Sequence, residues 1–92
     1  MSGELERIAK QLVKAALLKA SKEAPNGGGQ ATCRVLGSAV AATERTVYRW
    51  KAWSEECENG LPPSTKKLVA LAKYCGWTEY QLTDLVFKLL EG

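Results

Sequence analysis

Residues 34–53 read RVLGSAVAATERTVYRWKAW, and this stretch decides the fold. Two helical segments, Ala31 to about Val40 and Glu44 to about Cys57, are separated only by Ala41-Ala42-Thr43. So short a connection forces two helices to cross steeply. The stretch therefore predicts a helix-turn-helix formed by the second and third helices of the chain.

The packing needs of such a turn are met by particular residues. Gly37 supplies the small residue where the later helix crosses the earlier one, and Ala39-Val40 supply apolar side chains before the chain reverses. Val47 and Trp50 lie three apart and would both point into the core. This phase leaves one outer face on the helix, formed by Glu44, Arg45, Tyr48, Arg49 and Ala52.

The outer face of the predicted helix suits DNA. An α-helix fits the major groove, and residues near its N-terminal end reach the base edges. Arg45 and Arg49 lie one turn apart, so either could bind guanine through two hydrogen bonds, whereas Thr46 and Lys51 are better placed for phosphates. Thr43 is the expected N-cap. A solvated basic face on a protein-binding helical hairpin is the alternative interpretation of the same pattern.

Three further helices are predicted around this pair. A long amphipathic helix spans Gly3 to about Ala24, with Ser2 as its cap, and residues 25–29 form a Gly-rich linker. A helix from Thr65 to Tyr74 follows the Ser64 cap, and the last helix begins after Thr78 with a capping box to Gln81. The whole chain, residues 1–92, is thus predicted to be one compact all-α domain of five helices.

Apolar spacing predicts which residues of these helices are buried. The first helix carries a wide apolar stripe, most of which we expect to face the core: Leu5, Ile8, Leu12, Val13, Ala15, Ala16, Leu17, Leu18 and Ala20. The last helix is expected to bury Leu82, Leu85, Val86, Leu89 and Leu90. Trp53 and Cys57 continue the stripe of Val47 and Trp50 and are also expected in the core.

Composition excludes several functional classes. The chain has 92 residues, a net charge of +3, 46% hydrophobic residues, three cysteines and no histidine. Without histidine, a nucleophile elbow or a phosphate-binding loop, enzymatic activity is not expected. Cys33, Cys57 and Cys75 are widely spaced, so we expect reduced thiols, no metal site and no cofactor. Because neither a signal peptide nor a membrane-spanning run is present, a cytoplasmic protein is expected.

The run TERTVYRWK, residues 43–51, resembles the recognition helix of the lambda-repressor-like helix-turn-helix superfamily. Residues 61–86, LPPSTKKLVALAKYCGWTEYQLTDLV, resemble its Pro-led fourth helix and capped fifth helix, and the phage CII-type transcriptional activators look most similar. The resemblance implies a phage or prophage transcription regulator. It implies groove contacts by Thr43, Glu44, Arg45, Tyr48 and Arg49, and a DNA-backbone contact by Arg34 at the start of the second helix.

The chain departs from this pattern at two places. Ala41 stands where the superfamily usually has glycine, and it is strained if its φ is positive. The long first helix and the Gly-rich linker are also not typical of these proteins.

Partners other than DNA are suggested by the second half of the chain. One such motif reads only a few base pairs, so a homodimer or higher homo-oligomer is expected, with Trp77, Tyr80 and Phe87 as candidate subunit contacts. Shielding of the core edge explains these three aromatic residues equally well. Glu55, Glu56 and Glu58 form an acidic patch that should point away from DNA, either solvated or in contact with RNA polymerase.

Two functional classes stay open at this level. The first is a sequence-specific DNA-binding regulator, and the second is a helical protein-interaction module, such as an inhibitor or adaptor of a host protein, on the same scaffold. Operator sequence, half-site spacing and the choice between activator and repressor are not encoded in a pattern of this kind.

Overall fold

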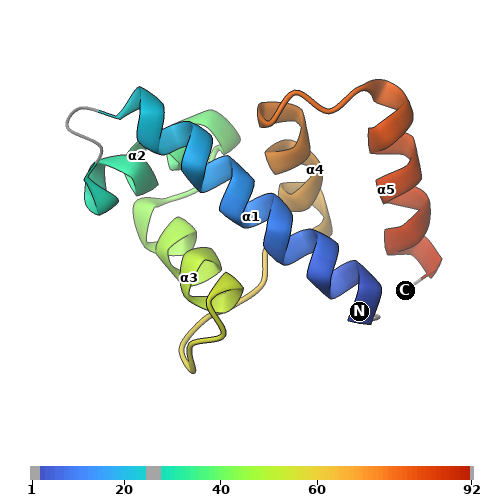
Figure 1. Cartoon of the computed structure of the whole chain (residues 1–92), viewed down its shortest axis with the longest axis horizontal. Coiled ribbons are helices and arrows are strands. Elements are labelled where there is room, and N and C mark those ends of the chain that lie inside the picture. Colours follow the sequence, from blue (N-terminus) through green and yellow to red (C-terminus); the bar gives the residue numbers. More distant parts are fainter. Residues whose placement is uncertain (1–2, 25–27, 92) are drawn as a thin grey trace.

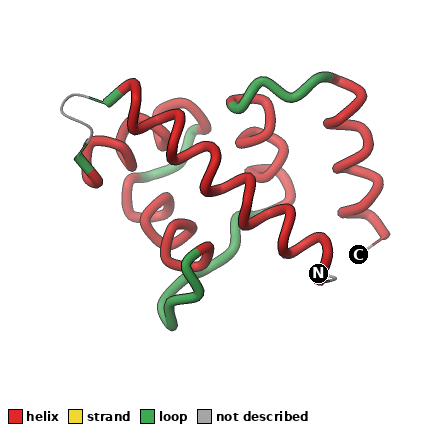
Figure 2. The backbone as a smooth tube through the Cα atoms, viewed as in Figure 1, coloured by secondary structure: helices red, strands yellow, loops and turns green. Residues whose placement is uncertain are grey.

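Helices make up most of the chain in a computed structural model, which describes residues 3–24 and 28–91 (Figure 1). These ranges contain no strand, and the loops between helices are short except for the one that follows the third helix (Figure 2). The expected all-α class is confirmed. The helices in order are α1 (Gly3–Glu23), α2 (Gly29–Val40), α3 (Glu44–Ser54), α4 (Thr65–Tyr74) and α5 (Glu79–Glu91).

The first helix, α1, is the central helix of the fold. It runs diagonally across the molecule and packs against α2, α3 and α4, whereas α5 packs against α4 at one end of the long axis (Figure 1). The expected cap at Ser2 and linker residues 25–27 lie outside the described residues. None of the described helices is both long enough and apolar enough to cross a lipid bilayer.

The core forms where one side of α1 meets the other helices. The buried residues of α1 include three alanines, Ala9, Ala16 and Ala20, and small side chains let the partner helices approach closely. These residues, with Leu5, Leu12 and Val13, pack in one cluster with Leu36, Val40, Val47, Trp50, Leu68 and Leu71.

Most of the predicted stripe on α1 faces the core, as expected, but its edges do not. Ala15 is exposed, Ile8 is half-buried and Leu18 is 60% exposed. The partner helices cover only one side of α1, so the apolar residues at the edges of the stripe stay in solvent.

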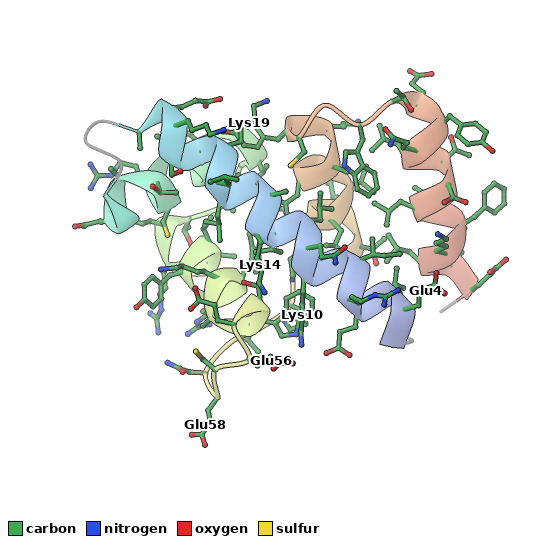
Figure 3. The ribbon with its side chains drawn as sticks, in the orientation of Figure 1. Glu4, Lys10, Lys14, Lys19, Glu56 and Glu58 are labelled. Atoms are coloured by element: carbon green, nitrogen blue, oxygen red, sulfur yellow. The ribbon has the colours of Figure 1, made fainter. Side chains whose placement is uncertain are left out.

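Polar side chains of α1 also join it to the rest of the molecule. The Nζ atom of Lys19 donates a 2.5 Å hydrogen bond to the carbonyl of Tyr74 and lies 4.5 Å from the centre of its ring. Burial and a hydrogen bond from its hydroxyl to Glu23 raise the pKa of Tyr74 to about 12. In the N-terminal half of α1, the Nζ atom of Lys10 lies 3.2 Å from Oε1 of Glu56, in the loop after α3 (Figure 3).

Two helix boundaries differ from the prediction. α2 begins at Gly29 rather than Ala31, because Gly28 is extended and its carbonyl accepts hydrogen bonds from both the amide and the hydroxyl of Thr32. α3 ends at Ser54 rather than Cys57. Glu56 has a left-handed φ of 61°, and the Cys57 amide turns back to the carbonyl of Ala52.

The loop after α3 accounts for a further correction. Cys57 is exposed rather than part of the core, whereas Trp53 packs half-buried against the core. Gly60 lies against the backbone of α3, where a Cβ atom would approach the amide nitrogen of Trp53 to 2.1 Å. The Leu61 amide then donates to the carbonyl of Arg49, so the loop runs back along α3.

The burial expected for α5 is wrong in part. Leu85 is buried and Leu82 and Leu89 are half-buried, but Val86 is 37% and Leu90 is 79% exposed. The capping box is confirmed, since the Thr78 amide donates to Oε1 of Gln81 and the Gln81 amide donates to the Thr78 hydroxyl. α5 is therefore a well-formed helix with one covered side.

The turn between α2 and α3 carries the strain expected at Ala41. Its φ of 56° and ψ of 49° are left-handed, a conformation in which the Cβ atom costs an L-residue about 1–2 kcal/mol. Glycine avoids this cost but loses more backbone entropy on folding.

We expect Ala41→Gly to raise the free energy of unfolding by about 0.5–1 kcal/mol, measured by urea denaturation. Ala15→Gly is the control, because Ala15 is exposed in the middle of α1, and there glycine should lower stability by about 1 kcal/mol. Equal effects of the two substitutions would show that the turn is unstrained.

Candidate nucleic-acid interface

The reversal between α2 and α3 is built on a close backbone approach. The Ala42 amide donates a 2.8 Å hydrogen bond to the carbonyl of Gly37, one turn back in α2. A Cβ atom on Gly37 would lie only 2.5 Å from the carbonyl oxygen of Ala42. The predicted need for the smallest residue at position 37 is confirmed, and the contact fixes where α3 starts.

Thr43 caps α3 as expected. Its hydroxyl oxygen accepts a 3.1 Å hydrogen bond from the Thr46 amide, and its hydroxyl donates a 2.8 Å bond to the Thr46 hydroxyl. This arrangement satisfies one of the free amides of the first turn. Both threonine hydroxyls thus face the N-terminal end of α3, where a phosphate is favoured electrostatically.

The phase of α3 is set by two buried residues. Val47 is fully buried and Trp50 is 3% exposed, as predicted. The opposite side consequently faces solvent: Arg45 is exposed, Tyr48 is 61% exposed, and Arg49 is half-buried. Lys51 is half-buried, with its Nζ atom 5.9 Å from the centre of the Tyr48 ring. The structure brings these four candidate residues together on one surface.

Glu44, the one acidic residue of that surface near the start of α3, has a basic neighbour. Nε of Arg34 lies 3.5 Å from its carboxylate, and the two side chains join α2 to α3. Because α2 begins at Gly29, Arg34 lies in the second turn rather than at the start of the helix. Both side chains are substantially exposed, so the pair adds little to stability. Its effect is to offset a negative charge beside the proposed DNA surface.

The acidic loop after α3 lies at the other end of the same surface. A cavity of about 430 Å³ is lined by Arg45, Tyr48 and Arg49 together with Glu58 from the loop. Glu58 projects at the tip of the loop, and Glu56 is turned toward Lys10 of α1 (Figure 3). A polyanion would therefore meet positive charge over the first two turns of α3 and negative charge beyond them.

One residue that the sequence did not single out supports this surface. The Nζ atom of Lys67, in the first turn of α4, donates 2.9 Å hydrogen bonds to the carbonyls of Val40 and Ala41. A cation is favoured at the C-terminal end of a helix, where the carbonyls are unsatisfied. Lys67 thereby fixes the end of α2 and the strained turn. No local pattern predicts this contact, since the partners are separated by more than twenty residues.

The candidate subunit contacts lie elsewhere. α5 packs on α4, at the opposite end of the molecule from α2 and α3 (Figure 1). Tyr80 is 85% and Phe87 62% exposed, whereas Trp77 is half-buried against the core. The aromatic residues of this end therefore belong to a surface separate from that of α3.

Comparisons with known proteins add no further constraint. No protein-family model, curated protein or solved structure matches this chain. The function is argued below from the geometry of α2 and α3.

The phase of α3 can be tested at its buried tryptophan. Trp50→Ala should lower the free energy of unfolding by about 3–5 kcal/mol, because the substitution leaves a large cavity in the core. Thermal or urea denaturation measures the loss, with half-buried Trp53→Ala as a control that should cost less. A Trp50→Ala protein with the parent's melting temperature would mean that α3 is rotated relative to the core.

The role of Lys67 is tested by removing its charge while keeping its length. Lys67→Met should lower the free energy of unfolding by about 1 kcal/mol, because it leaves two carbonyls at the end of α2 without their charged donor. The neighbouring Lys66 is exposed, so Lys66→Met is the matched control and should have no effect. Equal stability of the two variants would contradict the proposed contact.

Proposed function

We propose that the protein is a sequence-specific DNA-binding transcription regulator that inserts residues 43–52, the N-cap and first nine residues of α3, into the major groove. One observation carries the proposal: two arginines, a tyrosine and a lysine occupy the outer face of a helix whose inner face is locked by Val47 and Trp50. α2 and α3 then act together as a helix-turn-helix.

Each residue of the surface has a role in this proposal. Arg45 and Arg49 point from one side of α3 and bind base edges, with guanine as the preferred partner because it offers two acceptors. Tyr48 makes an apolar contact in the groove between them. Thr43, Thr46 and Lys51 contact phosphates, which set the position of the helix without reading sequence. Arg34 contacts the DNA backbone from α2 and offsets the charge of Glu44.

The proposal includes a homo-oligomer, because a single short recognition helix contacts too few base pairs for strong discrimination. Tyr80 and Phe87 provide exposed aromatic surface for a subunit contact. A phage or prophage origin rests on the resemblance of residues 43–51 and 61–86 to the CII-type activators.

The second candidate function is a helical protein-interaction module. The exposed apolar side of α5 favours it, since large exposed apolar patches usually mark protein contacts. The two functions differ in salt dependence. Phosphate contacts release counterions, so DNA affinity falls steeply with salt, whereas an apolar protein interface is much less sensitive.

The reading face is tested with two arginine variants. Arg45→Ala and Arg49→Ala should each weaken binding to the selected DNA sequence by about 1–3 kcal/mol without changing the melting temperature, because each removes a base contact from the surface. The sequence is first obtained by selection from a random duplex pool, and binding is followed by fluorescence anisotropy.

The exposed Arg7 of α1 provides the matched control, because Arg7→Ala removes the same charge away from α3. It should weaken binding only slightly. If all three variants bind the selected DNA as tightly as the parent, α3 is not the reading helix. If no sequence is enriched in the selection, the protein-interaction module becomes the better proposal.

A further inference from the structure

α1, α2 and α3 form a groove that overlaps the proposed DNA surface at Arg45, Tyr48 and Lys51 and continues past it to α1. Two cavities, of about 350 and 590 Å³, share Gly29, Cys33 and Lys51 in their linings. Leu18 of α1 and Tyr48 of α3 line these cavities, and their side chains are 60% and 61% exposed. We call this surface the basic groove, for the reason that follows.

The charge of the basic groove is positive. Lys14, Arg45 and Lys51 line it, and Lys14 projects from α1 on the side toward α3 (Figure 3). Its two acidic residues are Glu44, which is paired with Arg34, and Glu55. Burial raises the pKa of the Cys33 thiol, so this residue adds no negative charge near neutral pH. The groove thus combines exposed apolar side chains with an excess of cations.

The outer side of α5 is also apolar, but α5 carries the opposite charge. Tyr80, Phe87 and Leu90, spaced by seven and three residues, lie on the side away from buried Leu85 and are 62–85% exposed. The charged residues of this helix are Glu79, Asp84 and Glu91 against a single base, Lys88, which pairs with Asp84 at 3.3 Å. α5 therefore presents an apolar line on a helix with a net charge of −2.

We infer that the acidic apolar side of α5 in one copy of the protein docks into the basic groove of a second copy. Both surfaces are apolar and their charges are opposite, so docking removes exposed apolar area and pairs unlike charges. Packing α5 against α5 of another copy would also cover the apolar line. It would, however, bring two helices of net charge −2 together, and like charges oppose such a contact.

Head-to-tail docking has a structural consequence. The two contacting surfaces differ, and they lie at opposite ends of the molecule (Figure 1). After two copies dock, one groove and one α5 of the pair remain free, and association continues to rings or open chains instead of stopping at a dimer. If the proposed DNA-binding function holds, docking also covers Arg45 and Tyr48, so this association belongs to the protein without DNA and competes with DNA binding. On DNA, the released α5 becomes available for the subunit contact of the proposed oligomer.

The test measures association of the full chain without DNA, by sedimentation velocity from about 10 μM to about 1 mM. The parent should form species larger than a dimer as concentration rises, and association should weaken at least about tenfold when NaCl is raised from about 0.05 to about 0.5 M. Leu18→Asn and Phe87→Asn should each abolish association. Ala39→Asn, which changes an exposed apolar residue of α2 that lines neither cavity of the groove, should leave it unchanged.

Two charge-reversal variants test whether α5 contacts the basic groove and not another surface. One variant carries Glu79→Lys and Asp84→Lys, and the other carries Lys14→Glu and Lys51→Glu. Each should be monomeric alone, and an equimolar mixture should associate again, because the reversed α5 of one variant matches the reversed groove of the other. All changed residues are exposed or half-buried, and circular dichroism verifies the fold of each variant.

Two outcomes would overturn the inference. A parent protein that stays monomeric over the whole concentration range excludes any such contact. Association that survives Leu18→Asn and the groove charge reversal but is lost in Phe87→Asn assigns the contact to α5 alone. Neither outcome depends on DNA. The proposed DNA-binding function is therefore tested independently, by the arginine variants.

Discussion

The close contact between Gly37 and the turn at Ala41-Ala42 is the constraint on which the proposed DNA surface depends. Because no Cβ atom intervenes, the carbonyl of Ala42 can lie over α2 and the chain can reverse within three residues. The reversal requires a left-handed residue, and alanine accepts that conformation at a cost that the surrounding contacts must offset. Lys67 contributes to this by binding the carbonyls on both sides of the α2 terminus.

The two ends of the molecule present different surfaces. At one end, α2 and α3 pack on α1 and present a basic and aromatic outer surface. At the other end, α5 contacts the rest mainly through α4, so most of its circumference stays in solvent. A helix held on one side contributes less to the core and is free to form contacts with other molecules. The packing of a single copy leaves Tyr80, Phe87 and Leu90 62–85% exposed.

The charged residues are also distributed unevenly over the molecule. The net charge of +3 is small, but it is the sum of an acidic α5, an acidic loop after α3 and a strongly basic remainder. Local fields, not the net charge, decide what approaches each surface over a distance of about 10 Å. A mildly basic chain can therefore carry both a surface suited to a polyanion and a helix suited to a basic partner.

The sequence by itself determined the elements and their local chemistry. Capping residues such as Thr43 and Thr78, the small residue at position 37 and the spacing of Val47 and Trp50 act within one or two turns of chain, so their effects could be predicted from neighbouring residues. Hence the five helices, the phase of α3 and the membership of Arg45, Tyr48 and Arg49 in one outer surface were all predicted.

Only the tertiary structure decided contacts between distant segments and the extent of coverage. Two such contacts are the hydrogen bonds of Lys67 to the end of α2 and the ion pair of Arg34 with Glu44. Both depend on how the helices are placed in space. Whether Ala15, Leu18, Val86 and Leu90 are covered depends on how many helices pack on each side, which periodicity does not report. The early end of α3 likewise follows from the loop that folds back on it, because Gly60 can reach the backbone of Trp53 only in the assembled protein.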